Sequence, residues 1–179
     1  MLSFAWGSVG VIYLYHGTDV PFDVPNPKRG RKGTDFGQGF YLTPDFEAAS
    51  RMAKRVARRK NSNTSVVMCF ALDEKELAAA GLNVRTLNYI DSTWLWFVVA
   101  NRYFQQESQD HNLDQRWDIV HGMVADDKVV MLLNALVKGE SSEELVLAKL
   151  KSAPFKTVQY SFHTERAVSL LRLVEVKNV

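Results

Sequence analysis

The sequence holds few of the residues that covalent or metal-based stabilisation needs. Among its 179 residues there is one cysteine, Cys69, and there are four histidines. One cysteine excludes a disulfide within the chain, and histidines this far apart in the sequence predict no metal site. No apolar run approaches the roughly 18 residues of a membrane span, and the apolar start lacks the basic residues and length of a secretory signal. We therefore expect a cytoplasmic protein without metal or membrane contact.

Long linkers, low-complexity tracts and internal repeats are also missing. An apolar content of 46% with 11% aromatic residues excludes the disordered and fibrous classes, and the chain is long enough to bury a core. These features predict a single domain over residues 1–179. Cys69 lies in the apolar run 65–72 and is expected to be a small buried hydrophobe.

Positive charge is unevenly distributed. The net charge is +2, but residues 28–60 hold ten basic and three acidic residues, a balance of +7 that leaves −5 elsewhere. This segment predicts a basic loop at 28–32 and a basic helix face at 51–60. The face can be merely solvated, or it can attract NAD phosphates, an acidic partner or nucleic acid.

Short strands and helices are predicted to alternate along the chain. Strands are expected at 11–15, 65–72, 117–124, 158–162 and 173–179. Helices are expected after Thr43 as N-cap, at 91–106, at 128–137, after a capping box at Ser141, and after Thr164. Helix 91–106 is apolar nearly all round, so it must be largely buried or cover a partner. The pattern predicts an α+β protein with two small, mainly antiparallel sheets.

Two motifs combine glycines with a histidine and a tyrosine, each on a strand. The first is Tyr15-His16-Gly17-Thr18, in which Gly17 is expected to let the backbone approach a ligand. The second is Gly33-Thr34-Asp35-Phe36-Gly37-Gln38-Gly39-Phe40-Tyr41-Leu42-Thr43, a glycine-rich turn followed by the tyrosine. This layout suits dinucleotide binding. Each residue also has a structural alternative: His16 as a hydrogen bonder at a strand end, Tyr41 as core filling, and the glycines as turn residues.

The two motifs resemble those of NAD-dependent ADP-ribosyltransferases of the diphtheria-toxin and poly(ADP-ribose) polymerase type, and most closely a small bacterial branch of unknown function. Two later segments of that branch also match, and they read Asp118-Ile119-Val120-His121-Gly122-Met123-Val124-Ala125-Asp126 and Gln159-Tyr160-Ser161-Phe162-His163-Thr164-Glu165 here. The resemblance implies an ADP-ribosyltransferase-like split β-sheet core with surrounding helices, and NAD as substrate.

The resemblance also implies roles for single residues. His16 would hydrogen-bond the adenosine ribose, Gly17 and Thr18 would offer backbone groups to the nicotinamide amide, and Tyr41 would stack on the nicotinamide ring. The remaining members of the implied NAD-binding set are Gly37, Gly39, Phe40 and Met52.

Two positions depart from the family pattern. Met52 stands where many relatives have a second aromatic wall of the nicotinamide slot, although its polarisable sulfur can still pack against a ring. Gln159 stands where a catalytic glutamate is usual, and its amide oxygen can accept the same hydrogen bond without the charge. We expect slower chemistry or a different acceptor. His121 is a weaker site candidate. The other polar residues of the two later segments are expected to have structural roles: His163 and Thr164 as capping residues between a strand and a helix, Glu165 in the first turn of that helix, and Asp126-Asp127 as a helix start.

These observations predict a mono-ADP-ribosyltransferase that transfers ADP-ribose from NAD to a protein or nucleic acid, with His16, Tyr41 and Gln159 as catalytic residues. The resemblance implies a bacterial toxin or phage-defence effector held in check by an antitoxin. A second hypothesis is a degenerate NAD- or ADP-ribose-binding module that acts through its apolar helix. A third is a basic ribonuclease-like toxin using His16 and His163 as general acid and base.

Overall fold

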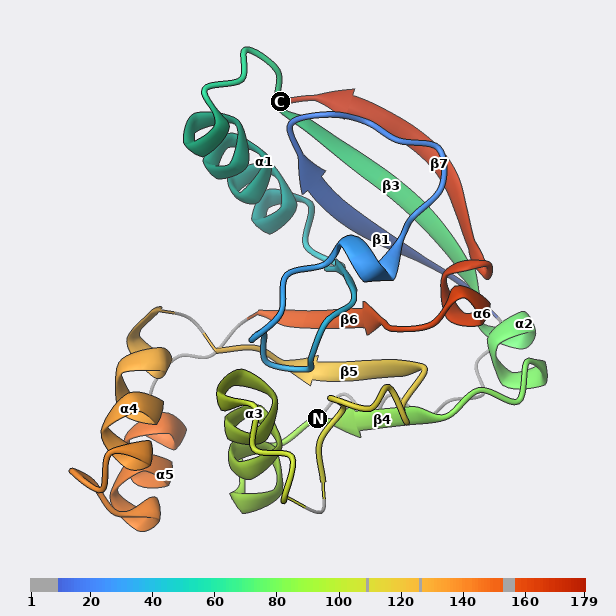
Figure 1. Cartoon of the computed structure of the whole chain (residues 1–179). Helices are drawn as coiled ribbons and strands as arrows, with labels where there is room; N and C mark the ends of the chain where they lie inside the picture. The colour runs from blue at the N-terminus through green and yellow to red at the C-terminus, as the bar shows by residue number, and fades with distance from the viewer. Residues whose placement is uncertain (1–9, 109, 126, 153–156) are drawn as a thin grey trace.

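The computed structural model describes residues 10–108, 110–125, 127–152 and 157–179. These residues form an α+β fold with two β-sheets, as predicted (Figure 1). The strands are β1 (Val11–Thr18), β2 (Phe40–Leu42), β3 (Val66–Asp73), β4 (Val84–Leu87), β5 (Ile119–Met123), β6 (Val158–Phe162) and β7 (Leu171–Asn178). The helices are α1 (Phe46–Lys60), α2 (Glu74–Ala79), α3 (Ser92–Tyr103), α4 (Asp127–Val137), α5 (Glu143–Ser152) and α6 (Glu165–Val168), with a short 3-10 helix, η1 (Pro27–Arg29).

Within the described ranges, the two sheets meet at one point of backbone hydrogen bonding. The first has the order β1-β3-β7 and is antiparallel; the second has the order β2-β6-β5-β4 and is antiparallel except for the β4–β5 pair. In Figure 1 the strands of the first sheet run diagonally above the horizontal β6 and β5. Tyr15 in β1 and Thr43 after β2 exchange backbone hydrogen bonds of 2.8 and 3.0 Å. The end of β2 is therefore fixed beside the second half of β1.

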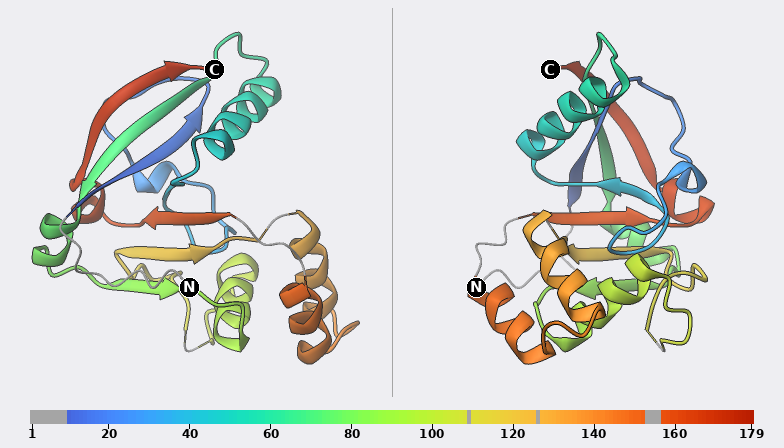
Figure 2. Two further views of the ribbon diagram at one scale, coloured as in Figure 1. Left: turned by 180° about the vertical axis from the view of Figure 1, so that it is seen from behind. Right: turned by 60° about the vertical axis from the view of Figure 1, so that its left-hand side comes forward.

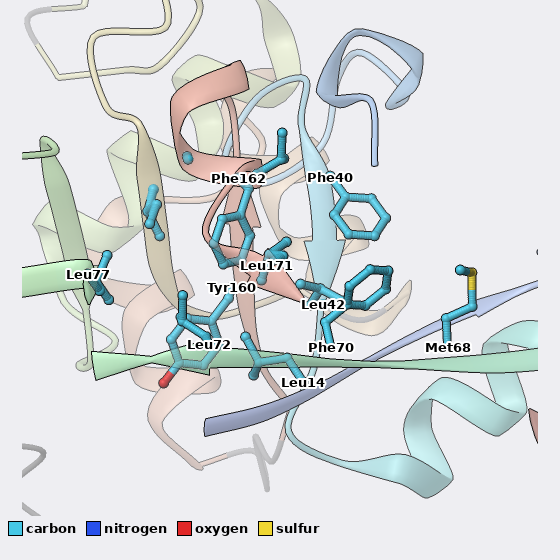
Figure 3. Packing of buried hydrophobic residues seen from close by; sticks show 13 residues of the cluster. Leu14, Phe40, Leu42, Met68, Phe70, Leu72, Leu77, Tyr160, Phe162 and Leu171 are labelled. Carbon is cyan, nitrogen blue, oxygen red and sulfur yellow. The ribbon is translucent and has the colours of Figure 1, made fainter. Parts of the chain in front are cut away.

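The main hydrophobic core lies between the two sheets (Figure 3). Its strand residues are Leu14, Phe40, Leu42, Met68, Phe70, Leu72, Ile119, Tyr160, Phe162 and Leu171. Val67, on the other face of β3, packs with Ala49 and Ala53 of α1. Because β3 is covered on both faces, seven of its eight residues are buried, which agrees with its nearly continuous apolar sequence. Cys69 is one of them, as expected.

A second core lies on the opposite face of the four-stranded sheet, against α3, α4 and α5. Figure 2 shows α4 and α5 side by side, with α3 next to them under the sheet. Trp94, Leu95, Phe97, Val98 and Val99 of α3 are fully buried, so the prediction that this helix is largely buried is confirmed. The helix is shorter than predicted, because Phe104 at its C-cap adopts a left-handed conformation with φ of 57°.

Helix α1 begins two residues later than predicted. Asp45 is its N-cap, and the Asp45 carboxylate accepts hydrogen bonds from the N–H groups of Glu47 and Ala48. Thr43 instead takes part in the bridge to Tyr15, so the prediction that Thr43 is the N-cap is wrong. A carboxylate is as good a cap as a hydroxyl, and strand pairing decides between the two.

Some elements differ from the sequence prediction because their signals are short or lie at boundaries. Helix α2 and the four-residue β4 were not predicted, and β7 begins at Leu171 instead of 173. The Ser142 hydroxyl accepts from Leu145 N–H at the start of α5. The prediction of a helix here is confirmed, but the capping box at Ser141 is wrong, because Ser141 Oγ has no hydrogen-bond partner among the described residues and leucine stands three residues after Ser142. Thr164 caps α6 as predicted. Asp126 lies outside the described residues.

Candidate functional site

His16 lies at the point where β1 meets β2. Its Nδ1 lies 2.9 Å from the Tyr41 carbonyl oxygen, which only an N–H can approach as a hydrogen bond, so Nδ1 carries the proton. Its ring packs against Phe40 and Phe22, with centroids 4.6 and 5.7 Å away. Burial lowers the pKa of His16, although the bond to Tyr41 opposes this shift. The neutral imidazole of this half-buried residue therefore has Nε2 left as a hydrogen-bond acceptor.

The Tyr41 side chain lies on the face of β2 opposite to Phe40 and His16, because Phe40 and Tyr41 are consecutive residues of one strand. Its hydroxyl donates to the Gly37 carbonyl oxygen at 2.7 Å, accepts from Phe36 N–H at 3.1 Å, and lies 2.9 Å from Thr34 Oγ1. The ring stacks on Phe36 at 6.2 Å between centroids, with 14° between planes. Burial raises the pKa of Tyr41. The hydroxyl therefore organises the glycine-rich loop 33–39 from within.

Three glycines of the two motifs make room for the protein itself. A Cβ at Gly17 would lie 2.0 Å from the Ala49 carbonyl oxygen of α1. At Gly39 it would lie 2.7 Å from His163 Nδ1, and at Gly37, where φ is 89°, it would lie 3.1 Å from the Asn112 carbonyl oxygen. The expectation that Gly17 leaves space for a ligand is wrong, because α1 occupies that space. Whether its backbone contacts NAD stays a prediction.

We expect Gly17→Ala to destabilise the fold by about 1–3 kcal/mol or more, with or without NAD, because overpacking against helix backbone cannot relax easily. Urea unfolding followed by tryptophan fluorescence measures this loss. Gly81→Ala is the control: a Cβ there would meet nothing within 4 Å, although φ is +59°. Its cost should be limited to the roughly 1–2 kcal/mol of a left-handed alanine, with no added cost from overpacking. Full stability of Gly17→Ala with loss of NAD binding would restore the ligand interpretation.

Gln159 lies on the same face of the second sheet as Tyr41. Tyr41 pairs with Ser161, and Gln159 stands two residues before Ser161 on β6. Its half-buried carboxamide makes no hydrogen bond with any described residue. Met52 is 41% exposed on α1, and its packing against the nicotinamide ring stays a prediction.

The motif that ends in His163 is a buried hydrogen-bond network. His163 Nδ1 lies 2.9 Å from the Gln38 carbonyl oxygen, and its Nε2 lies 2.8 Å from Ser161 Oγ. His163 is 1% exposed and Ser161 is fully buried. The neighbouring Thr164 hydroxyl donates to Asp118, whose second carboxylate oxygen accepts from Asn83 N–H. Because both ring nitrogens are engaged and no solvent reaches them, the hypothesis of His163 as a ribonuclease general acid or base is wrong.

A buried ion pair also fixes the glycine-rich loop, and no sequence pattern predicted this pair. The Asp35 carboxylate pairs with the Arg102 guanidinium of α3 and accepts a 2.6 Å hydrogen bond from Ala125 N–H. The side chains are 5% and 18% exposed. The two residues are 67 positions apart in the chain, so no local sequence pattern can predict that they pair. The loop is thus held to both α3 and the segment after β5.

The outer face of α1 carries the predicted positive charge. Ala49, Ser50, Ala53 and Ala57 are buried, whereas the exposed residues include Arg51, Lys54, Arg55, Arg58, Arg59 and Lys60. Lys60 pairs with Asp19 at 2.8 Å, and Arg51 lies 3.8 Å from Asp45. The remaining members have no acidic partner in the described part of the chain. A solvated face and a polyanion-binding face both agree with this arrangement.

The donor set fits NAD only in part. His16 Nε2 and the Gln159 amide oxygen are available to ribose hydroxyls, whereas the Tyr41 hydroxyl is used within the protein. Within the described ranges no group of three or more His, Cys, Asp or Glu residues could hold a metal ion. In the same residues no helix combines the length and apolarity that crossing a bilayer requires.

Comparison with known families gives one match. The model described as "Protein of unknown function (DUF3990)" matches residues 12–173. The chain belongs to this family. No curated protein sequence and no solved structure matched. The DUF3990 match begins in β1 and ends in β7, so it covers both sheets and every candidate site residue named above.

Proposed function

We propose that this DUF3990 protein is an NAD-dependent mono-ADP-ribosyltransferase. The observation that carries the proposal is the hydrogen bond between His16 Nδ1 and the Tyr41 carbonyl. It joins the two motifs on which the resemblance rests, beside the bridge at which the two sheets exchange backbone hydrogen bonds. The split into sheets of three and four strands also agrees with the core that the resemblance implies.

The proposed reaction breaks the bond between nicotinamide and ribose C1′, and the electron pair leaves with nicotinamide. A lone pair of the acceptor forms the new bond to C1′, and the acceptor's proton passes to solvent. Neutral His16 accepts from a ribose hydroxyl through Nε2. Gln159 lies on the opposite face of β2, the Tyr41 face, so its amide oxygen would meet the developing positive charge of an NAD that is bent over the edge strand β2. The basic face of α1 attracts the phosphates. The leaving group is already cationic, so the site needs little acid–base chemistry.

The substitution of glutamine for glutamate gives this proposal a direct test. We expect Gln159→Glu to raise the rate of nicotinamide release from NAD by tenfold or more, because a charge aimed at the transition state is worth several kcal/mol in a protected site. His16→Ala should lower it by a similar factor. Nicotinamide release is measured with and without cell lysate, and thermal melting checks that each variant is folded. Lys149→Ala on α5 is the control.

A second candidate is a module that binds NAD or ADP-ribose without turnover. The internal hydrogen bonds of the Tyr41 hydroxyl and the uncharged Gln159 favour it. NAD binding by calorimetry, with no nicotinamide release by either the natural protein or Gln159→Glu, would select this candidate. Release that requires lysate would instead indicate a macromolecular acceptor. The toxin or phage-defence role, with an antitoxin partner, stays a prediction from the resemblance.

A further inference from the structure

A pocket separate from the β1–β2 junction lies between the glycine-rich loop and the segment after α3. Its volume is about 170 Å³. We call it the carboxamide pocket, and its lining residues are Lys32, Gly33, Gly37, Gln38, Phe104, Gln106, Asn112, Leu113 and Gln115. Pockets for drug-sized ligands measure roughly 300–1,000 Å³. This volume therefore suits one planar ring and not a whole dinucleotide.

The backbone around the pocket is held in unusual conformations. Seven described residues have a positive φ, and four of them line this pocket: Phe104, Gln115, Gly33 and Gly37. A left-handed conformation costs roughly 1–2 kcal/mol for a residue with a Cβ, and such residues cluster at ligand sites. At Phe104 this conformation ends α3 and leaves the aromatic side chain 53% exposed. A Cβ at Gly33 would lie 3.5 Å from Phe104 Cζ, so the ring lies beside the glycine-rich loop.

The chemistry of the lining suits a base with an attached phosphate. Gln106 and Gln115 are exposed, and their carboxamides make no hydrogen bond with described residues, so they can pair with donor and acceptor edges. Lys32 is the charged residue among the described residues that line the pocket. Gln38 Nε2 donates to the carbonyl oxygens of Lys28 and Gly30, at 2.7 and 2.9 Å. This links the basic loop 28–32 to the pocket rim.

The pocket also adjoins the candidate site. Gly37 lines it, and the Gly37 carbonyl oxygen accepts the hydrogen bond from the Tyr41 hydroxyl. Asn112, a second lining residue, is positioned by a hydrogen bond from its N–H to Asn101 Oδ1 of α3, 2.8 Å long. A ligand in the pocket would therefore be separated from Tyr41 by the backbone of a single glycine.

We propose that the carboxamide pocket binds one nucleobase of a single-stranded nucleic acid, stacked on Phe104, with the neighbouring phosphates on loop 28–32. Stacking on an aromatic side chain is how proteins hold unpaired bases, and a base inside a duplex cannot enter such a pocket. The role of this strand as ADP-ribose acceptor rests on the proposed function. The binding of the strand to the pocket does not depend on the proposed function.

Fluorescence anisotropy with short labelled DNA and RNA strands, on the whole protein and without NAD, tests the proposal. Phe104→Asn removes the ring but suits the left-handed backbone, and it should weaken binding about tenfold, as loss of base stacking does. Phe104→Tyr should bind like the natural protein. Lys32→Gln should weaken binding and reduce its salt dependence. Tyr89→Asn, at another exposed aromatic (77%), is the control and should change nothing.

Three results would overturn the proposal. The first is equal affinity of Phe104→Asn and the natural protein, and the second is equal affinity for a duplex of the same sequence. The third is displacement of the strand by NAD together with weaker NAD binding by Phe104→Asn, which would assign the pocket to NAD. Strand binding without any nicotinamide release would support the proposal for the carboxamide pocket and contradict the proposed function. Nicotinamide release without strand binding would support the proposed function and contradict the proposal for the carboxamide pocket.

Discussion

Arg102→Ala is expected to destabilise the protein by about 3–5 kcal/mol, because it leaves the Asp35 carboxylate buried without its cation. Asp35 is 4% exposed, and Ala125 N–H would be its remaining hydrogen-bond donor among the described residues. Domains are typically stable by only about 5–15 kcal/mol, so much of the stability would be lost. Urea unfolding monitored by tryptophan fluorescence measures the effect, since Trp94 is fully buried.

Two further variants test whether the loss of stability in Arg102→Ala arises from the burial of the Asp35 charge. Lys28→Ala breaks an ion pair with Glu165 whose side chains are 70% and 79% exposed, and the unfolding midpoint should not change measurably. The double variant Asp35→Asn with Arg102→Met removes both charges and should recover part of the loss. If Arg102→Ala unfolds at the same urea concentration as Lys28→Ala, Asp35 is not held as the structure has it.

Acidification from pH 7 to 5 is expected to lower the free energy of unfolding by about 4 kcal/mol through two histidines. Burial lowers the pKa of His121 and of His163 to about 4 in the folded state, whereas the unfolded value is about 6.5. Between these values the unfolded chain binds protons that the folded chain does not, so stability falls as the pH falls. Each histidine contributes about 2 kcal/mol by pH 5 and about 3 kcal/mol by pH 4.

His121→Gln tests this origin of the pH dependence. His121 packs against Tyr160 with ring centroids 4.1 Å apart, and its buried Nδ1 has no hydrogen-bond partner in the described part of the chain. The variant should therefore show a smaller stability difference between pH 7 and pH 5, by about 2 kcal/mol. Chemical unfolding at each pH supplies the numbers. An unchanged difference would mean that His121 is protonated in the folded protein.

Local signals predicted the elements that are long or strongly patterned. The continuous apolar run gave β3, and the alternation of small apolar and basic residues gave α1 with its two faces. The same signals could not choose between Thr43 and Asp45 as the cap, because the choice depends on the pairing of Thr43 with Tyr15. Strand β4 was missed because four residues in parallel pairing with β5 carry too little periodicity.

For the candidate site, too, the sequence predicted some features and missed others. The sequence singled out His16 and Tyr41, and the structure joins them through a hydrogen bond, but it also directs their side chains to opposite faces of β2. It singled out Gly17 and Gly39 without revealing that α1 and His163 fill the space beside them. The Asp35–Arg102 pair and the carboxamide pocket depend on contacts between distant segments, which a single sequence does not encode in its spacing.

The strand order of the first sheet has a consequence during protein synthesis. Strand β3 lies between β1 and β7, and residues 74–170 are translated after β3 and before β7. Until β7 leaves the ribosome, the β1–β3 pair presents an open edge to which another strand can add. The nascent chain is therefore exposed to mispairing through most of translation, and a chaperone that shields this edge should improve the yield of folded protein.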